Sequence, residues 1–561
     1  MQFKQRDFAQ APRVLTIRDL KVGLVGRPDA QPVLNGIDLD IRAGETHCLV
    51  GESGSGKSVT SLAAMGLLPK GALAVTGGRI ALDDFEITTA TPAQMRDLRA
   101  RRMSMIFQEP MTALNPVLRV GDQIEEVLKM HTDLSPAETR ERTLDIMDQV
   151  HLPDVKRIYA SYPYQLSGGQ RQRIMIAMAL VLDPALLIAD EPTTALDVTT
   201  QLQILKLIEE MQEAHGTAVL FITHDMGVVA EIADTVSVMQ AGTIVETAPI
   251  RELLSQPKED YTRKLLTAVP NLTPRPARPS TADRRVLDVE KLDKTYGGGG
   301  IFRRREGVPA ARDVTFAIDA GRTLGIVGES GSGKSTVARC IMRLIDPSGG
   351  EVTIAGSEIS RLSRRQLQPH RRHFQIVFQD PYRSLNPRWT VGRSLCEGPI
   401  NFGTPKAEAM EHAAELMDLV SLPRDALQRY PHQFSGGQRQ RIAIARAVAM
   451  RPDLLVADEA VSALDVSVQA QVLDLLDEVQ ETFGIAMLFI THDLRVAAQI
   501  CDEVVVMQKG RVVEKGPAGE VLSRPSHAYT RSLIEAAPGR HWDFANFRPV
   551  EAAAGVSGGV A

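Results

Sequence analysis

The sequence GESGSGKS occurs twice in this chain, and its residue types are those that bind phosphate. In a Gly-x-x-x-x-Gly-Lys-Ser segment, the glycines let consecutive backbone N–H groups turn inward, and the lysine reaches the β- and γ-phosphates of a nucleotide. The serine after each lysine can ligate Mg²⁺. The candidate residues of the two copies are Gly51, Ser53, Gly54, Gly56, Lys57 and Ser58, and Gly328, Ser330, Gly331, Gly333, Lys334, Ser335 and Thr336. The repeat therefore predicts two nucleotide sites.

Adjacent carboxylates follow two apolar segments that have the pattern of buried strands, as Asp190-Glu191 and Asp458-Glu459. The aspartate can hold Mg²⁺, and the glutamate can orient or deprotonate an attacking water, a role that contributes about 10²- to 10⁴-fold in rate. An isolated Asp-Glu pair is more often a solvated turn. The strand before each pair and the phosphate loop upstream favour the catalytic interpretation.

His224 and His492 each end another apolar segment, within the sequence Phe-Ile-Thr-His-Asp. A histidine at the end of a strand is commonly a structural residue. Ligands of parallel sheets bind at the carboxyl ends of the strands. The recurrence of the histidine at that position therefore favours contact with the γ-phosphate.

Two Ser-Gly-Gly-Gln segments open helical patterns later in the chain. Glycines at a helix start expose N–H groups to an anion, and the serine adds a hydroxyl donor. The alternative is a simple capped helix. The candidate residues are Ser167, Gly169, Gln170, Ser435, Gly437 and Gln438.

These motifs recur in the same order because the chain is a tandem duplication. The segment Leu166–Glu246 aligns with the segment Phe434–Glu514 without a gap, at an offset of 268 residues. Two long copies indicate two domains, each with its own core, rather than a solenoid. We expect a first domain at 1–268 and a second at 286–540.

The segments outside these domains have the composition of connections. Four prolines in the ten residues from Pro270 to Pro279 predict an extended spacer, within an expected linker at 269–285. We expect residues 541–561 to form a flexible C-terminal tail.

Within each half, short apolar segments alternate with helical patterns. The segments 46–51, 185–190 and 218–224 are continuous apolar strands, which predict an α/β fold with a largely parallel sheet covered on both faces. A helix start is predicted at Ser135, Pro136 and Glu138, which have the spacing of a capping box with proline at the first helical position. Thr404-Pro405 predicts the start of the matching helix in the second half.

The composition indicates a globular protein that does not cross a membrane. The hydrophobic content is 43%, the charged content is 24% and the net charge is −5, which gives no general attraction to nucleic acid or to an anionic membrane. The longest apolar stretch, Ile174–Leu182, is about half of a bilayer span. The amino terminus lacks the apolar region of a secretory signal, so a cytoplasmic location is expected. The cysteines, expected to be reduced and buried, are Cys48, Cys340, Cys396 and Cys501.

Taken together, the motifs resemble those of the ATP-binding subunits of ABC transporters over nearly the whole chain. The resemblance rests also on Gln108 in FQEP, Gln379 in FQDP, and Asp197 and Asp465 in TALD and SALD. It implies two tandem P-loop NTPase domains, each with a mostly parallel sheet core, an antiparallel β subdomain and a helical signature subdomain. ATP and Mg²⁺ are the implied cofactors. The implied metal ligands are Ser58, Gln108, Asp190, Ser335, Gln379 and Asp458.

A narrower resemblance, to the ATPase subunits of dipeptide, oligopeptide and nickel importers, rests on QEPMTALNP and QDPYRSLNP and on late segments around Tyr261 and Tyr529. It implies two separate transmembrane permease subunits, an extracytoplasmic solute-binding protein, and peripheral association with the cytoplasmic face of the plasma (inner) membrane. Gln108 and Gln379 are candidates for coupling to the permeases. Members of that group often carry a late cysteine cluster for an iron–sulfur centre. The chain has no such cluster, so we predict no iron–sulfur cofactor.

The family implies composite sites, in which the loop at 51–58 faces Ser435 and Gly437, and the loop at 328–335 faces Ser167 and Gly169. Charge-assisted contacts from ATP to both halves would close them, and hydrolysis would part them. The adenine-stacking aromatic of the family corresponds to Tyr296, whereas the first half has Leu24. We therefore expect the site built on Lys57 to bind ATP more weakly.

Other functions remain open at this point. A tandem ATPase that acts on ribosomes or nucleic acid would also lack membrane spans, and its contacts with phosphate could come from Arg303–Arg305 and from the four arginines Arg275, Arg278, Arg284 and Arg285. Such short runs are more often solvated loops. A small-molecule kinase does not explain two complete motif sets, and exporters usually carry their own membrane spans. For an importer, peptide is the leading substrate, with glutathione-like thiols, opines, metal chelates and nickel as alternatives.

Overall fold

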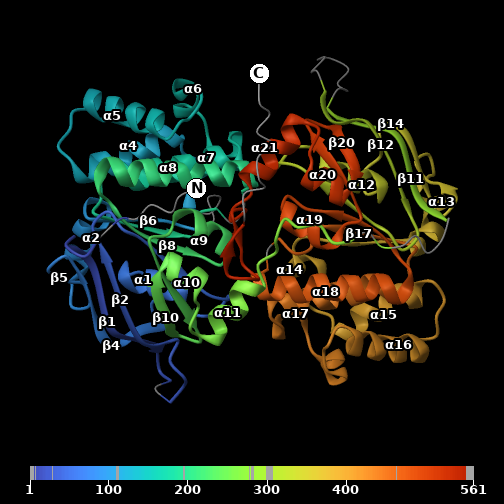
Figure 1. Ribbon diagram of the computed structural model, residues 1–561, viewed down its shortest axis with the longest axis horizontal. Helices are drawn as coiled ribbons and strands as arrows, with labels where there is room; N and C mark the ends of the chain where they lie inside the picture. Colours follow the sequence, from blue (N-terminus) through green and yellow to red (C-terminus); the bar gives the residue numbers. More distant parts are fainter. Residues whose placement is uncertain are drawn as a thin grey trace, which may run out of the picture. The chain divides into compact units, whose positions relative to one another are not determined.

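The protein is described by a computed structural model that covers residues 6, 8–27, 29–108, 113–193, 196–276, 278, 284–297, 307–462 and 464–550. It divides into two compact units (Figure 1). The first unit comprises Met1–Leu196, Thr200–Val269 and Pro538–Ala561, and the second comprises Asp197–Thr199 and Pro270–Ala537.

The core of the first unit is a six-stranded sheet in the order β10-β9-β3-β8-β7-β6. All neighbours in it pair in parallel except β10 and β9, which are antiparallel. Its strands are β3 (Thr46–Val50), β6 (Met103–Ile106), β7 (Leu186–Asp190), β8 (Ala218–Thr223), β9 (Thr235–Gln240) and β10 (Thr243–Pro249). Every residue of β3, β7 and β8 is buried, as a strand covered on both faces requires. The three predicted strands are thereby confirmed.

A second, antiparallel sheet packs in the same unit, in the order β2-β1-β4-β5. Its strands are β1 (Arg13–Leu24), β2 (Leu34–Arg42), β4 (Leu73–Leu82) and β5 (Phe85–Glu86). In Figure 1 these strands and the helices α4–α7 lie at opposite ends of the first unit. The expected antiparallel and helical subdomains are both present.

The helices of the first unit follow the same alternation. They are α1 (Lys57–Ala64), α2 (Pro92–Arg101), α4 (Val120–His131), α5 (Pro136–Gln149), α6 (Val155–Tyr159), α7 (Gly168–Leu180), α8 (Val198–His215), α9 (Met226–Ile232), α10 (Ile250–Ser255) and α11 (Asp260–Thr267).

The second unit repeats this plan, with sheets in the orders β12-β11-β14-β15 and β16-β17-β18-β13-β19-β20. Its strands are β11 (Arg285–Tyr296), β12 (Val308–Asp319), β13 (Thr323–Val327), β14 (Gly349–Ile354), β15 (Ser357–Glu358), β16 (Phe374–Val377), β17 (Leu454–Asp458), β18 (Ala486–Ile490), β19 (Glu503–Gln508) and β20 (Arg511–Pro517). Its helices are α12 (Lys334–Ile341), α13 (Arg364–Leu367), α14 (Pro381–Ser384), α15 (Val391–Asn401), α16 (Lys406–Leu419), α17 (Gly436–Val448), α18 (Val466–Phe483), α19 (Leu494–Ile500), α20 (Ala518–Ser523) and α21 (Ala528–Ala536).

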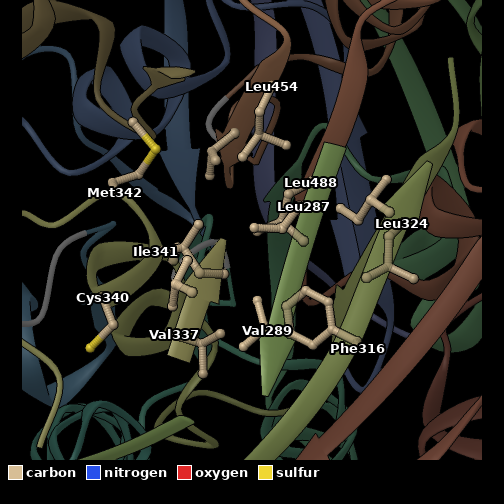
Figure 2. Packing of buried hydrophobic residues seen from close by; sticks show 14 of the residues in the cluster. Leu287, Val289, Phe316, Leu324, Val337, Cys340, Ile341, Met342, Leu454 and Leu488 are labelled. Atoms are coloured by element: carbon tan, nitrogen blue, oxygen red, sulfur yellow. The ribbon is translucent and has the colours of Figure 1, made fainter. Parts of the chain in front are cut away.

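One apolar core joins the two sheets of the second unit. Figure 2 shows side chains of β11, β12 and α12 meeting those of β13, β17 and β18. Phe316 of β12 and Leu324 of β13 are each 3% exposed, and Val337 of α12 is fully buried. The first helix after the phosphate loop is therefore fixed by apolar contacts on both sheets.

The connecting segments are ordered where the structure describes them. Residues 270–276 and 278 belong to the second unit, and residues 538–550 belong to the first. The latter include a two-stranded hairpin, β21 (Trp542–Asp543) and β22 (Arg548–Pro549), at the start of the segment expected to be a flexible tail. Among the described residues, none of the helices combines the length and apolarity that a membrane span needs.

The predicted capping box of α5 is confirmed. The Ser135 hydroxyl accepts a hydrogen bond from the Glu138 backbone N–H at 3.4 Å, and the Glu138 carboxylate accepts one from the Ser135 N–H at 2.8 Å. The matching helix α16 differs, since it begins at Lys406 with Pro405 as N-cap and has no side-chain capping bond. The predicted start at Thr404-Pro405 is therefore one residue early, because Pro405 has φ −56° and ψ 142°, outside the helical region.

Ser135→Ala should weaken α5 because it removes this cap, at a cost of about 1 kcal/mol. We expect amide hydrogen exchange in the first turns of α5 to become about fivefold faster. Thr404→Ala is the matched control in the second half and should leave exchange in α16 unchanged. Equal acceleration in both helices, or none in α5, would contradict the assignment.

Candidate functional site

The first phosphate loop lies between β3 and α1. Its inner side packs so closely against neighbouring backbone that a side chain there would collide with it. A Cβ on Gly51, at φ +154°, would lie 2.2 Å from the Met239 carbonyl oxygen. A Cβ on Gly54, at φ +79°, would meet no atom of the described residues within 4 Å, so these residues leave that side of the loop open. Lys57, the first residue of α1, donates from Nζ to the Gly51 and Glu52 carbonyls at 2.7 and 2.9 Å. A tight inner turn, an open outer face and a lysine at a helix start fit a triphosphate.

Two predicted metal ligands of the first unit meet at the carboxyl end of β7, where Asp190 ends the strand and Ser58 lies in the first turn of α1. The Ser58 hydroxyl donates to Asp190 Oδ1 at 3.2 Å. Burial raises the pKa of Asp190 above its ordinary value, although the hydrogen bond from Ser58 works against that shift. A hydroxyl and a carboxylate oxygen at one point are donors that Mg²⁺ prefers. Among the described residues there is no group of three or more histidine, cysteine, aspartate or glutamate side chains that could hold a metal.

Glu191 leaves the strand in a left-handed conformation, at φ +47°, which is uncommon for a residue with a side chain. Its N–H remains bonded to the Ile222 carbonyl of β8 at 2.9 Å. The Gln108 amide donates to one carboxylate oxygen at 2.8 Å, and His224 Nδ1 lies 3.1 Å from the other. The structure thus brings Gln108 and His224 together at the carboxylate of Glu191, the predicted base. Residues 109–112, in the segment after Gln108, lie outside the described residues.

The second unit builds the same cluster. Lys334 donates to the Gly328 and Glu329 carbonyls at 2.7 and 2.8 Å, and the Ser335 hydroxyl donates to Asp458 at 3.0 Å. Burial lowers the pKa of Lys334 against the attraction of the carboxylates around it, and raises that of Asp458. Burial therefore disfavours the charged form of both groups.

Glu459, at φ +51°, accepts a hydrogen bond from the Gln379 amide at 2.8 Å. His492 Nδ1 lies 3.7 Å from its other oxygen, farther than in the first unit. Burial opposes ionisation of Glu459, but the contact with His492 and the charge of Lys334 outweigh it and hold the pKa of Glu459 below its ordinary value. A carboxylate that stays ionised is ready to accept a proton.

The two Ser-Gly-Gly-Gln segments form helix starts with reciprocal caps. Gln170 donates its N–H to the Ser167 hydroxyl at 3.3 Å, and Gln438 does the same to Ser435 at 3.4 Å. Gly169 and Gly437 are in the first turns of α7 and α17. Each segment therefore presents N–H groups and a hydroxyl at a helix N-terminus, whose role toward nucleotide stays a prediction.

The two residues predicted to differ at the adenine occupy equivalent ends of strands. Tyr296 ends β11 with 42% of its surface exposed, and Leu24 ends β1 with 39% exposed. Lys294 Nζ lies 5.3 Å from the centre of the Tyr296 ring. Both side chains are free to cover a ligand, one with an aromatic face and one with an aliphatic surface.

Sequence reasoning missed one residue in each site. The Tyr261 hydroxyl of α11 accepts the N–H of Glu52 in the first phosphate loop at 3.3 Å. The Tyr529 hydroxyl of α21 accepts the N–H of Glu329 in the second loop at 3.1 Å. The signal was present, since both tyrosines stand in Tyr-Thr-Arg segments at the 268-residue offset. Burial raises the pKa of Tyr529 to about 12, which keeps the phenol neutral.

Comparisons with known proteins agree with this geometry. A family model described as ABC transporter matches residues 34–194 and 311–462, which include both phosphate loops and both carboxylate pairs. The chain belongs to the ABC transporter family. A second model, described as oligopeptide/dipeptide transporter, C-terminal region, matches residues 245–305 and 513–547. As an ATP-binding protein of this family, the chain is an ATPase, and its predicted α/β fold of two P-loop NTPase domains is confirmed.

Relatives of this ABC transporter ATPase match both halves together. The glutathione import ATP-binding protein GsiA of Escherichia coli O157:H7 is 45% identical over 95% of this chain and 90% of its own length. GsiA of Shigella boydii serotype 4 (strain Sb227) is 44% identical with the same coverage. Among solved structures, cbiO1 from Clostridium perfringens, part of the ABC transporter complex cbiONQ, is 28% identical with a TM-score of 0.38, and the match covers 43% of this chain and 92% of that one.

Replacing Tyr261 or Tyr529 by phenylalanine should weaken nucleotide binding, because each change leaves one loop N–H without its acceptor. The loss of one such bond, about 0.5 to 1.5 kcal/mol, corresponds to about two- to twelvefold in Kd at the affected loop. Titration of a fluorescent ATP analogue into each single variant would measure it. Unchanged affinity in both variants would show that the tyrosines do not support the loops.

Proposed function

We propose that this ATPase powers the import of glutathione or a closely related short peptide. The observation that carries the proposal is the match to glutathione import ATP-binding proteins across 95% of the chain, both halves included. The match of two segments to the oligopeptide/dipeptide transporter C-terminal region supports a peptide-type solute. An acidic net charge of −5 and these relatives favour transport over action on ribosomes or nucleic acid. The arginine run Arg303–Arg305, which raised the nucleic-acid alternative, lies outside the described residues.

In the proposed mechanism, ATP with Mg²⁺ supplies the phosphoanhydride bond whose hydrolysis drives the cycle. Lys57 would turn its ammonium from the loop carbonyls toward phosphate oxygens, while Ser58 and Asp190 would hold the metal. Glu191, oriented by the Gln108 amide and the His224 ring, would take the proton of the attacking water at a carboxylate oxygen. The corresponding residues of the second unit would act in the same way.

The two loops would be completed by the signature serines and glycines of the opposite half, as the family resemblance implies. The capped starts of α7 and α17 support this role, because N–H groups at a helix start attract the phosphates of a bound nucleotide. Hydrolysis would remove the charge-assisted contacts and let the halves part. This movement would be passed to two permease subunits at the cytoplasmic face of the membrane, fed by an extracytoplasmic solute-binding protein.

The proposal is tested by reconstituting the chain with its permeases and binding protein in vesicles. Glutathione carried by the binding protein should stimulate ATP hydrolysis. It should also be transported across the vesicle membrane when ATP is supplied on the side that carries the ATPase. An unrelated dipeptide and nickel ions serve as parallel substrates. If the dipeptide or nickel stimulates ATP hydrolysis and glutathione does not, the proposed substrate is wrong. If the chain co-purifies with ribosomes instead of permeases, the proposed role in transport is wrong.

The double variant Glu191→Gln with Glu459→Gln should bind ATP yet hydrolyse it more than about 100-fold more slowly, because both water-activating carboxylates are gone. Each glutamine keeps the shape of the side chain and can still contact Gln108 or Gln379. Steady-state phosphate release and equilibrium nucleotide binding measure the two properties separately. Turnover close to that of the unchanged protein would show that another group is the base.

The sites should differ in affinity because Tyr296 can stack on adenine and Leu24 cannot. Lys334→Ala leaves the first site as the working one, and Lys57→Ala leaves the second. We expect ATP to bind a few-fold more weakly to the Lys334→Ala protein than to the Lys57→Ala protein. An aromatic contact contributes about 0.5 to 1.5 kcal/mol, which accounts for a difference of this size. Titration of both variants with the same nucleotide checks this, and equal affinities would remove the explanation.

A further inference from the structure

The segments that follow each half belong to the other unit. The chain leaves the first unit after Val269, and the next residues are part of the second unit. It leaves the second unit after Ala537, and Pro538 onward is part of the first. In both cases the segment that follows contacts the helix that starts beside the predicted γ-phosphate histidine.

In the first unit the C-terminal segment packs on α9. The Gly539 N–H donates to the Glu231 carboxylate at 3.0 Å. A Cβ on Gly539, at φ +73°, would lie 2.7 Å from the Gly227 Cα and about 3 Å from the Phe544 ring, which is 2% exposed. This segment approaches α9 so closely that a side chain at residue 539 would collide with the Gly227 backbone.

Gly227 is part of the turn that holds His224. Its N–H donates to the Asp225 carboxylate at 2.8 Å, which caps the start of α9 one residue after the histidine. Displacement of Gly227 therefore moves the cap and, through it, the ring 3.1 Å from Glu191.

In the second unit the linker contacts the equivalent helix, α19, through arginine residues rather than through glycine. The Arg275 N–H donates to the Ala498 carbonyl of α19 at 2.9 Å. The Arg275 guanidinium donates to Asp477 of α18 at 3.1 Å, and the Arg278 N–H donates to Asp502, just after α19, at 3.3 Å. Two arginines thus attach the linker to charged groups around α19.

The two histidine helices differ at the residue that Gly539 approaches. Where α9 has Gly227, α19 has Arg495, whose side chain is 9% exposed and pairs with Asp493 at 2.8 Å. The start of the histidine helix beside each connecting segment therefore presents a different residue in the two units.

We propose that these exchanged segments position the histidines, so that each ATP site depends on the segment that follows the opposite half. Gly539 and Glu231 are positioning residues for His224, and Arg275 is one for His492. The inference rests on the proposed function of the two histidines.

The test counts trapped nucleotide at each loop. The full chain is incubated with Mg²⁺, orthovanadate and photoreactive 8-azido-ATP, and labelled peptides from the first and second loops are quantified by mass spectrometry. Gly539→Ala should lower trapping at the first loop about tenfold, a typical effect of misplacing a catalytic group, and leave the second loop unchanged. Nucleotide affinity without vanadate should stay within about twofold at both loops, since the phosphate contacts are intact. Arg275→Pro removes both the N–H that bonds Ala498 of α19 and the guanidinium that bonds Asp477, so it should lower trapping at the second loop and leave the first loop unchanged.

Gly216→Ala is the matched control, because this glycine of the first unit also has positive φ, +66°, but no atom within 4 Å of a Cβ. It should leave both loops unchanged. Glu231→Ala releases the segment without crowding it and should repeat the loss at the first loop, and Glu231→Gln, which keeps an acceptor oxygen, should restore it. If the unchanged protein traps nucleotide at neither loop, the proposed function fails. If it traps at both and Gly539→Ala and Glu231→Ala lower both loops equally or neither, the inference alone is wrong.

Discussion

The structure depends on charges held at the end of a buried sheet. Each unit brings a lysine ammonium and two acidic side chains to the carboxyl ends of β3, β7 and β8, or of β13, β17 and β18, which neighbour one another in the sheet. Parallel pairing places all these ends at one edge. Burial disfavours the charged forms of Asp190, Asp458 and Lys334. Such a site is at its most favourable when a metal cation and a phosphate anion enter together, and the proposed chemistry follows from that requirement.

The two sites share one plan and differ in detail. The histidine lies 3.1 Å from the predicted catalytic glutamate in the first unit and 3.7 Å in the second. Leu24 replaces Tyr296 at the predicted adenine position, and Gly227 replaces Arg495 at the start of the histidine helix. Duplication followed by such substitutions gives one chain two candidate sites of unequal geometry, each beside a different connecting segment.

Local sequence patterns predicted the parts of the site that local chemistry determines. The phosphate loops, the strands before Asp190 and His224, and the Ser135 cap all depend on residues a few positions apart. The tyrosine support of the loops was not predicted, because Tyr261 is 209 residues from its partner Glu52. The positions of the linker and the C-terminal hairpin were also missed. Their prolines and polar residues suggest a spacer and a tail, whereas Arg275 and Gly539 act through contacts with residues far away in the sequence.

Two complete ATP sites on one chain should be visible in a binding stoichiometry. The decisive measurement is equilibrium binding of a non-hydrolysable ATP analogue with Mg²⁺, in moles bound per mole of chain. We expect a stoichiometry of two for the unchanged protein and one for each of the single variants Lys57→Ala and Lys334→Ala. A stoichiometry of one for the unchanged protein, lost entirely in either variant, would contradict the presence of two sites.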